Sequence, residues 1–130
     1  MKFLIVDDML VIRRHLNHIL SPYGECDLAE SGVQAVQKVR ESLENSQPYD
    51  LICLDIMMPK QDGIMTLQLI RELEKNKAGD DLKPAKILII TSLNESDYIM
   101  ACLTNGCDGY LIKPIDRSKL FKELARLGIM

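Results

Sequence analysis

The stretch Leu51-Ile52-Cys53-Leu54-Asp55-Ile56-Met57-Met58-Pro59, with Asp62-Gly63 behind it, is the part of this sequence from which its architecture follows. Four apolar residues bounded by turn-forming residues are typical of a short strand buried on both faces, and such strands belong to parallel sheets covered by helices. Asp55 comes where this strand ends. Because ligands bind beyond the carboxyl ends of the strands in open α/β sheets, the Asp55 carboxylate is expected at the edge where chemistry takes place.

The sequence around this strand repeats one pattern, a strand followed by a helix. Strands are predicted at 3–6, 26–29, 51–54, 87–90 and 109–112. The three runs that are entirely apolar should lie in the middle of the sheet, and the two mixed runs should form its edges. Five such repeats with right-handed crossovers predict an α/β fold, a doubly wound five-stranded parallel sheet of order 2-1-3-4-5 with helices on both faces.

Capping residues and apolar spacing place the helices between these strands. Ser31 has the spacing of a capping box and should begin the second helix, and Asp62 and Asp116 are the expected N-caps of the third and fifth. The fourth helix has few apolar residues for its inner face, mainly Ile99, Cys102 and Leu103. We therefore expect it to be the least tightly held helix. The charged segment 76–84 is interpreted as a solvated connection, with a recognition loop as the alternative.

Length, charge and cysteine spacing limit the classes of protein. A chain of 130 residues, 47% of them hydrophobic, is the size of one domain with a single core, so residues 1–130 are interpreted as one domain. The net charge of −3 and the lack of a dense Lys/Arg run argue against direct binding of nucleic acid. Met1-Lys2 leads straight into a strand, so neither a signal peptide nor membrane insertion is expected. The four cysteines form no CxxC pair and are interpreted as reduced structural residues of a cytoplasmic protein.

Polar side chains collect at the carboxyl ends of four predicted strands. They are Asp7-Asp8, Asp55, Thr91-Ser92 and Lys113. Because the first and third strands are neighbours in the derived order, Asp7, Asp8 and Asp55 should converge. Two carboxylates about 4 Å apart repel by about 4 kcal/mol at an effective dielectric constant near 20, so three of them need a compensating cation. Mg²⁺ takes oxygen ligands and is commonly held by carboxylates, and Mn²⁺ accepts the same ligands.

Lys113 and Thr91 complete a set of groups that suits phosphoryl transfer. Lys113 adds a positive charge on the far side of Asp55, and Thr91 adds a hydroxyl donor. A carboxylate flanked by a divalent cation, an ammonium and a hydroxyl can attack phosphorus in line while the cations spread the charge of the phosphoryl oxygens. Each residue also has an ordinary explanation: Asp8 as an N-cap, Thr91 as a solvated residue, and Lys113-Pro114 as a turn. Their shared position at successive strand ends favours the functional interpretation.

This set of motifs resembles the response-regulator receiver domains of the CheY type, from Lys2 to about Leu127. The residues that carry the resemblance are Val6-Asp7-Asp8, Asp55-Ile56-Met57-Met58-Pro59 with Asp62-Gly63, Thr91-Ser92, and Gly106-Cys107-Asp108-Gly109-Tyr110-Leu111-Ile112-Lys113-Pro114. The resemblance implies a flavodoxin-like fold. It also implies a phosphoprotein of two-component signalling, in which Asp55 accepts a phosphoryl group from a phosphohistidine on a sensor histidine kinase or a histidine phosphotransfer protein.

The resemblance implies a metal site as well. Asp8, Asp55 and the backbone carbonyl of Met57 would hold Mg²⁺, and Asp7 would join them through water. The Met57 side chain is apolar, so only its backbone carbonyl would serve as a ligand.

The other residues that the resemblance singles out would bind the phosphoryl group and respond to it. Lys113 would bind a phosphoryl oxygen, with Thr91 and Ser92 beside it, and the peptide bond before Pro114 would be cis. Thr91 would move toward the phosphoryl group and Tyr110 would rotate inward. The surface of the fourth helix, fifth strand and fifth helix would then shift between two packings and control a downstream protein.

Several alternatives remain at this stage. The chain could be the receiver portion of a longer regulator with an output domain. An aspartate-nucleophile phosphatase is disfavoured because Met57 stands where those enzymes typically carry a second aspartate, and a flavin module because no hydroxyl-rich loop follows the first strand. The expected activity is weak self-catalysed phosphoryl transfer and hydrolysis rather than that of a conventional enzyme. His15 and His18 are interpreted as exposed helix residues rather than as phosphoryl donors or metal ligands.

Overall fold

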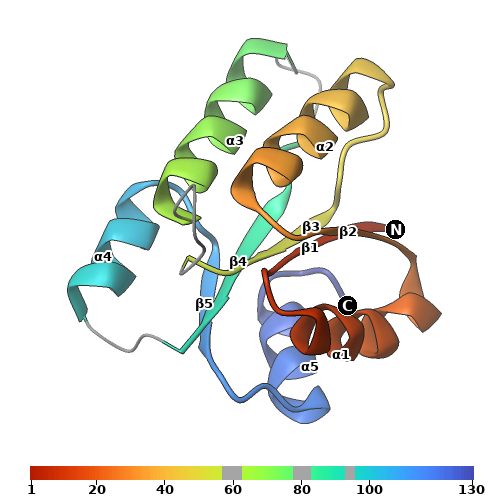
Figure 1. The fold of residues 1–130 in the computed structure, drawn as a ribbon, viewed down its shortest axis with the longest axis vertical. Coiled ribbons are helices and arrows are strands. Elements are labelled where there is room, and N and C mark those ends of the chain that lie inside the picture. The colour runs from red at the N-terminus through yellow and green to blue at the C-terminus, as the bar shows by residue number, and fades with distance from the viewer. Residues whose placement is uncertain (57–62, 78–82, 93–95) are drawn as a thin grey trace.

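The computed structural model describes residues 1–56, 63–77, 83–92 and 96–130 (Figure 1). Within these residues the strands are β1 (Lys2–Val6), β2 (Glu25–Ala29), β3 (Leu51–Leu54), β4 (Lys86–Thr91) and β5 (Gly109–Ile112). The helices are α1 (Leu10–Leu20), α2 (Gly32–Glu44), α3 (Gly63–Lys77), α4 (Ser96–Thr104) and α5 (Arg117–Arg126), and a short 3-10 helix (Ser21–Tyr23) follows α1. The predicted alternation of strands and helices is confirmed.

The strands form one parallel sheet of order β2-β1-β3-β4-β5, as predicted. All four residues of β3 are buried, whereas the edge strand β2 has exposed and half-buried positions. Val6 at the end of β1 lies opposite Leu54 at the end of β3. Because parallel strands end at the same edge of the sheet, the residues that follow Val6 and Leu54 are neighbours there.

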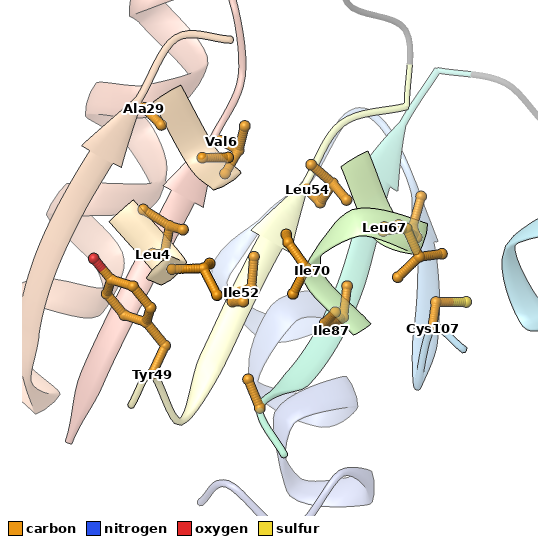
Figure 2. Packing of buried hydrophobic residues seen from close by; sticks show 14 of the residues in the cluster. Leu4, Val6, Ala29, Tyr49, Ile52, Leu54, Leu67, Ile70, Ile87 and Cys107 are labelled. Atoms are coloured by element: carbon orange, nitrogen blue, oxygen red, sulfur yellow. The ribbon is translucent and has the colours of Figure 1, made fainter. Parts of the chain in front are cut away.

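Helices cover both faces of the sheet, with α2, α3 and α4 on one face and α1 and α5 on the other (Figure 1). Alternate residues of each central strand therefore enter two separate apolar clusters. The cluster under α2 and α3 includes Leu4, Val6, Ile52, Leu54, Leu67, Ile70 and Ile87 (Figure 2). The cluster under α1 and α5 includes Phe3, Ile5, Leu16, Leu51, Cys53, Leu88 and Leu120. In the part of the chain that the structure describes, no helix combines the length and the apolar character needed to cross a bilayer.

The predicted caps explain where two helices begin. The Ser31 hydroxyl accepts a hydrogen bond from the backbone N–H of Gln34 at 3.2 Å, and Asp116 Oδ1 accepts one from the backbone N–H of Lys119 at 2.7 Å. The Gln34 side chain in turn accepts a hydrogen bond at 3.0 Å from the backbone N–H of Glu30, the residue before the N-cap. Each cap satisfies an amide that the first turn of a helix leaves without an intrahelical partner.

Three details differ from the prediction. The N-cap of α1 is Met9, with no side-chain cap, so the alternative of Asp8 as a cap is wrong. Leu103 is 49% exposed, because the sheet-facing side of this short helix is occupied by Cys102, its one buried residue. Helix α3 continues to Lys77, so it includes the first two residues of the predicted loop 76–84. Residues 78–82 and the predicted cap Asp62 lie outside the described residues.

Candidate functional site

The carboxyl ends of β1 and β3 bring three aspartates together. One carboxylate oxygen from each of Asp7, Asp8 and Asp55 lies within 4.8 Å of the other two. Asp7 and Asp55 are buried, at 1% and 4% exposure, whereas Asp8 is exposed. The backbone N–H of Asp55 donates to the Val6 carbonyl at 3.1 Å, so the pairing of β1 with β3 extends to the residue that carries the carboxylate. The predicted convergence of the three side chains is confirmed.

Lys113 supplies the positive charge among these carboxylates. Its Nζ donates to Asp7 Oδ2 at 2.8 Å and to Asp55 Oδ2 at 3.2 Å. We expected the ammonium on the far side of Asp55; it instead bridges both buried carboxylates, because Asp7 and Asp55 end neighbouring strands. Burial by itself would lower the pKa of Lys113, but the hydrogen bond to Asp7 and the charges of Asp55 and Asp7 outweigh burial and raise the pKa. The ammonium therefore stays charged at neutral pH.

The three carboxylates fit a small divalent cation. Carboxylate oxygens are ligands that Mg²⁺ prefers, and Mg–O distances of about 2.1 Å put the ligands of one ion at most about 4.2 Å apart. The separation of up to 4.8 Å within the group is close to that limit. Three carboxylates against one ammonium leave a formal charge of −2, which one divalent cation balances. Met57, the remaining predicted ligand, lies outside the described residues.

The other predicted site residues follow β4 and lie in or after β5. Thr91 ends β4 fully buried, and its carbonyl accepts a hydrogen bond from the backbone N–H of Lys113 at 2.7 Å. Ser92 is exposed. Tyr110 is half-buried in β5 against the cluster under α2 and α3, and burial is the main cause that raises its pKa to about 12. The peptide bond between Lys113 and Pro114 is cis, as the resemblance implied.

Two residues support the site in ways that the sequence analysis did not predict. Arg13 on α1 donates from a guanidinium nitrogen to the Asp7 carbonyl at 2.7 Å. Gly63 begins α3 against the backbone after Asp55: a Cβ on this residue would lie 2.2 Å from Ile56 Cα and 2.6 Å from the Asp55 carbonyl oxygen. The signals were a basic residue six positions after Asp7 and a glycine at the start of a helix. Neither signal indicates which backbone groups the residue contacts in the folded protein.

An apolar cavity of about 260 Å³ lies beside Lys113. It is lined by Val11, Ile12, His15, Leu16, Lys113, Pro114 and Ile115. A ring nitrogen of His15, Nε2, lies 2.9 Å from the Ile115 carbonyl oxygen and links α1 to the segment after β5. Val11 is 72% exposed, so the apolar wall of the cavity continues onto the surface. His15 and His18 are exposed on α1, as predicted.

Comparison with known proteins identifies the class. The family model of the response regulator receiver domain matches residues 3–125. The chemotaxis protein CheY of Treponema pallidum (strain Nichols) is 33% identical over 124 residues, which cover 95% of this chain and 80% of that protein. The osmosensing histidine protein kinase SLN1 of Saccharomyces cerevisiae is 34% identical over 123 residues, which cover 92% of this chain and 9% of that protein.

Solved structures agree with this class. A chain of the CheX-CheY-BeF3-Mg+2 complex from Borrelia burgdorferi has a TM-score of 0.84 and 30% identity, with 99% of this chain and 90% of that chain covered. The receiver domain of the histidine kinase CKI1 from Arabidopsis thaliana, complexed with Mg2+ and BeF3-, has a TM-score of 0.80 and 26% identity, with 96% and 89% covered. Fold and acidic site together define a CheY-like module of two-component signalling. The chain belongs to the response regulator receiver domain family.

Proposed function

We propose that this chain is a phosphorylation-controlled receiver that accepts a phosphoryl group on Asp55. The observation that carries the proposal is the buried Asp55 carboxylate, grouped with Asp7 and Asp8 and bridged to Asp7 by Lys113. Membership of the receiver family supports it. In this proposal residues 1–130 act as one domain in the cytoplasm, where a sensor histidine kinase or a histidine phosphotransfer protein supplies the phosphoryl group.

The transfer requires one bond to form and one to break. A carboxylate oxygen of Asp55 attacks the phosphorus of a phosphohistidine, the N–P bond breaks, and its electron pair stays on the imidazole nitrogen, which takes up a proton. The Lys113 ammonium, which donates to Asp55 at 3.2 Å, would bind a phosphoryl oxygen. Asp7, Asp8, Asp55 and the Met57 carbonyl would hold Mg²⁺ or Mn²⁺, which when bound spreads the charge of the phosphoryl oxygens. Later attack by water on the acyl phosphate gives slow autodephosphorylation.

The proposed switch uses residues between this site and the surface of α4, β5 and α5. Thr91 and Ser92 would bind the phosphoryl group, and Tyr110 would move inward as Thr91 moves. Helix α4 buries one side chain and exposes Met100 and Leu103, so few contacts oppose a change in its packing. A downstream protein would read this surface.

The phosphoryl donor would approach over α1 and the segment after β5. The apolar cavity beside Lys113 and the exposed Val11 provide an apolar contact surface next to the acidic site. Such a surface can bind a partner while its phosphohistidine reaches Asp55.

Incubation with Mg²⁺ and acetyl phosphate, followed by intact mass measurement, tests the proposal. The parent should gain one phosphoryl group, and Asp55→Asn should gain none. Asp50→Asn is a matched control, because Asp50 precedes the same strand at its other end and is exposed. Absence of an adduct on the parent, or an adduct that persists on Asp55→Asn, would overturn the proposal.

A second candidate is that these residues are the receiver portion of a longer regulator. The match to SLN1 supports this candidate, because the matched segment is only 9% of that longer protein. The mass of the protein isolated from its native source separates the two candidates.

A further inference from the structure

Arg13 is a largely buried cation that contacts the backbone of the acidic site. It belongs to α1, and its side chain is only 11% exposed. One guanidinium nitrogen, Nη1, donates to the Asp7 carbonyl at 2.7 Å, and the other, Nη2, lies 3.7 Å from Glu30 Oε2. The guanidinium thus connects the end of β1 to the segment between β2 and α2.

The outer end of this connection is itself held in place. Gln34 accepts a hydrogen bond from the Glu30 backbone N–H at 3.0 Å and donates from Nε2 to Glu30 Oε1 at 3.3 Å. Gln34 lies in the first turn of α2, whose Ser31 cap fixes it. The 3.7 Å ion pair with Glu30, whose side chain is 61% exposed, therefore gives Arg13 a weak second link toward the start of α2, in addition to its place on its own helix.

The inner end fixes the backbone between the two aspartates. Asp7 is held at four points: its N–H donates to Ala29, its carbonyl accepts from Arg13, and its carboxylate accepts from Met9 and Lys113. Because a peptide unit is planar, a fixed Asp7 carbonyl also fixes the N–H and the Cα of Asp8. The Met9 N–H on the other side of Asp8 is held by the Asp7 carboxylate at 2.9 Å, and this limits the rotation that sets the direction of the Asp8 side chain.

The Asp8 carboxylate depends on this backbone for its position. Asp8 is exposed, and among the described residues none makes a hydrogen bond or ion pair with its carboxylate. Its place within 4.8 Å of the Asp7 and Asp55 oxygens therefore comes from the chain that carries it.

We propose that Arg13 is a positioning residue for the divalent cation, because its hydrogen bond to the Asp7 carbonyl aims the Asp8 carboxylate at the acidic site. This inference rests on the proposed function of that site as a metal-dependent phosphoacceptor. Charge and position have opposite effects here. Loss of a nearby positive charge by itself strengthens cation binding, whereas loss of the correct orientation of the Asp8 carboxylate weakens it.

The test measures binding of Mg²⁺ by calorimetry and of Mn²⁺ from the spin resonance signal of the free ion, without any phosphodonor. Arg13→Met should weaken binding about tenfold, as for other residues that orient metal ligands. Arg13→Lys, which keeps the charge and a hydrogen-bond donor group but not the planar guanidinium, should bind with intermediate affinity. Arg14→Met is the matched control: it removes the same charge from an exposed neighbour and should bind Mg²⁺ at least as tightly as the parent.

A second measurement reports position directly. In the metal-free protein, Arg13→Met should shift the amide resonance of Asp8, and Arg14→Met should leave it unchanged. Equal or tighter Mg²⁺ binding by Arg13→Met overturns the inference and leaves the proposed function intact, whereas a parent that binds no Mg²⁺ overturns both. If Arg13→Met does not fold, Arg13→Lys compared with Arg14→Lys decides in the same way.

Discussion

Two clusters of charged side chains in this molecule differ in how their charges are balanced. The acidic site groups Asp7, Asp8 and Asp55 at the carboxyl ends of the strands, with one ammonium between Asp7 and Asp55. The second cluster, which we call the Arg71 cluster, consists of Arg71 and Glu74 on α3 and Asp108 before β5. The acidic site keeps an excess of negative charge in one small space. In the Arg71 cluster the charged groups are paired with one another and with backbone groups of the fold.

Backbone contacts show how the Arg71 cluster is satisfied. Arg71 donates to the carbonyls of Gly106 and Ala85 at 2.9 Å each, Glu74 Oε2 accepts from the Ala85 N–H at 2.7 Å, and Asp108 Oδ2 accepts from the Ile87 N–H at 2.8 Å. These contacts join α3 to the starts of β4 and β5. Charges that are paired and hydrogen-bonded hold structure, as at the buried Glu74 and the half-buried Arg71 and Asp108, whereas an unbalanced group of carboxylates could hold a metal ion. The contrast separates a structural cluster from a candidate metal site.

The largest effect is expected from breaking the Arg71 cluster. Arg71→Met leaves Glu74 and Asp108 without their cation and two backbone carbonyls without a donor, so the free energy of unfolding should fall by about 2–4 kcal/mol. Urea unfolding measures this change. Lys75→Met, an exposed substitution on the same helix, should stay within about 0.5 kcal/mol of the parent. A loss below about 1 kcal/mol for Arg71→Met would remove the distinction between the two clusters.

The opposite sign is expected at the acidic site. Asp8→Asn relieves repulsion from Asp7 and Asp55, so without metal the variant should be as stable as the parent or up to about 1 kcal/mol more stable. It should also lose the stabilisation that Mg²⁺ would give the parent under the proposed function, which is about 2.7 kcal/mol at 100 times the dissociation constant. Thermal unfolding with and without Mg²⁺ measures both effects.

The matched control for this prediction is Asp97→Asn. Asp97 is an exposed aspartate on α4, so this substitution makes the same change of charge away from the site and should keep the Mg²⁺ response. Marked destabilisation of metal-free Asp8→Asn would mean that the acidic site holds the fold together in the way the Arg71 cluster does.

The smallest effect is expected on the pKa of Tyr110, which responds to the negative charge of Asp55 in the acidic site. Burial, together with the charges of Cys102, Cys107 and Asp55, raises the pKa of Tyr110 to about 12. The phenol is thus kept protonated in the fold, and its contribution to stability is present below the unfolded-state pKa near 10 and lost as the pH rises toward 12. The ultraviolet titration of the parent minus that of Tyr110→Phe should show this step. Asp55→Asn should move the step slightly lower, and a step near pH 10 in the parent would contradict the assignment.

Much of the fold was predictable because the sheet is buried on both faces. A strand such as 51–54 then needs four apolar residues in a row, and the strands with mixed sequences must lie at the edges of the sheet. The convergence of Asp7, Asp8 and Asp55 followed from strand order, since it depends on topology and not on side-chain detail. The caps at Ser31 and Asp116 were predictable because a cap is a local hydrogen bond.

The details that could not be predicted depend on contacts between distant segments. The bridge from Lys113 to both Asp7 and Asp55 spans more than a hundred residues in one case, and no local pattern specifies it. Leu103 has the same residue type and helical spacing as a core position, yet it is 49% exposed and Cys102 is the one buried residue of that short helix.

The sequence by itself determined the order of the strands, the edge at which the polar residues collect and the identity of the three carboxylates, because periodicity and turn residues act over a few positions. Tertiary structure alone decided which carboxylates share the ammonium, that Arg13 holds the Asp7 carbonyl, and that Arg71 joins α3 to the starts of two strands. The physical reason is that a charged side chain takes its partner from whatever packing brings within about 3 Å, and packing is a property of the whole chain.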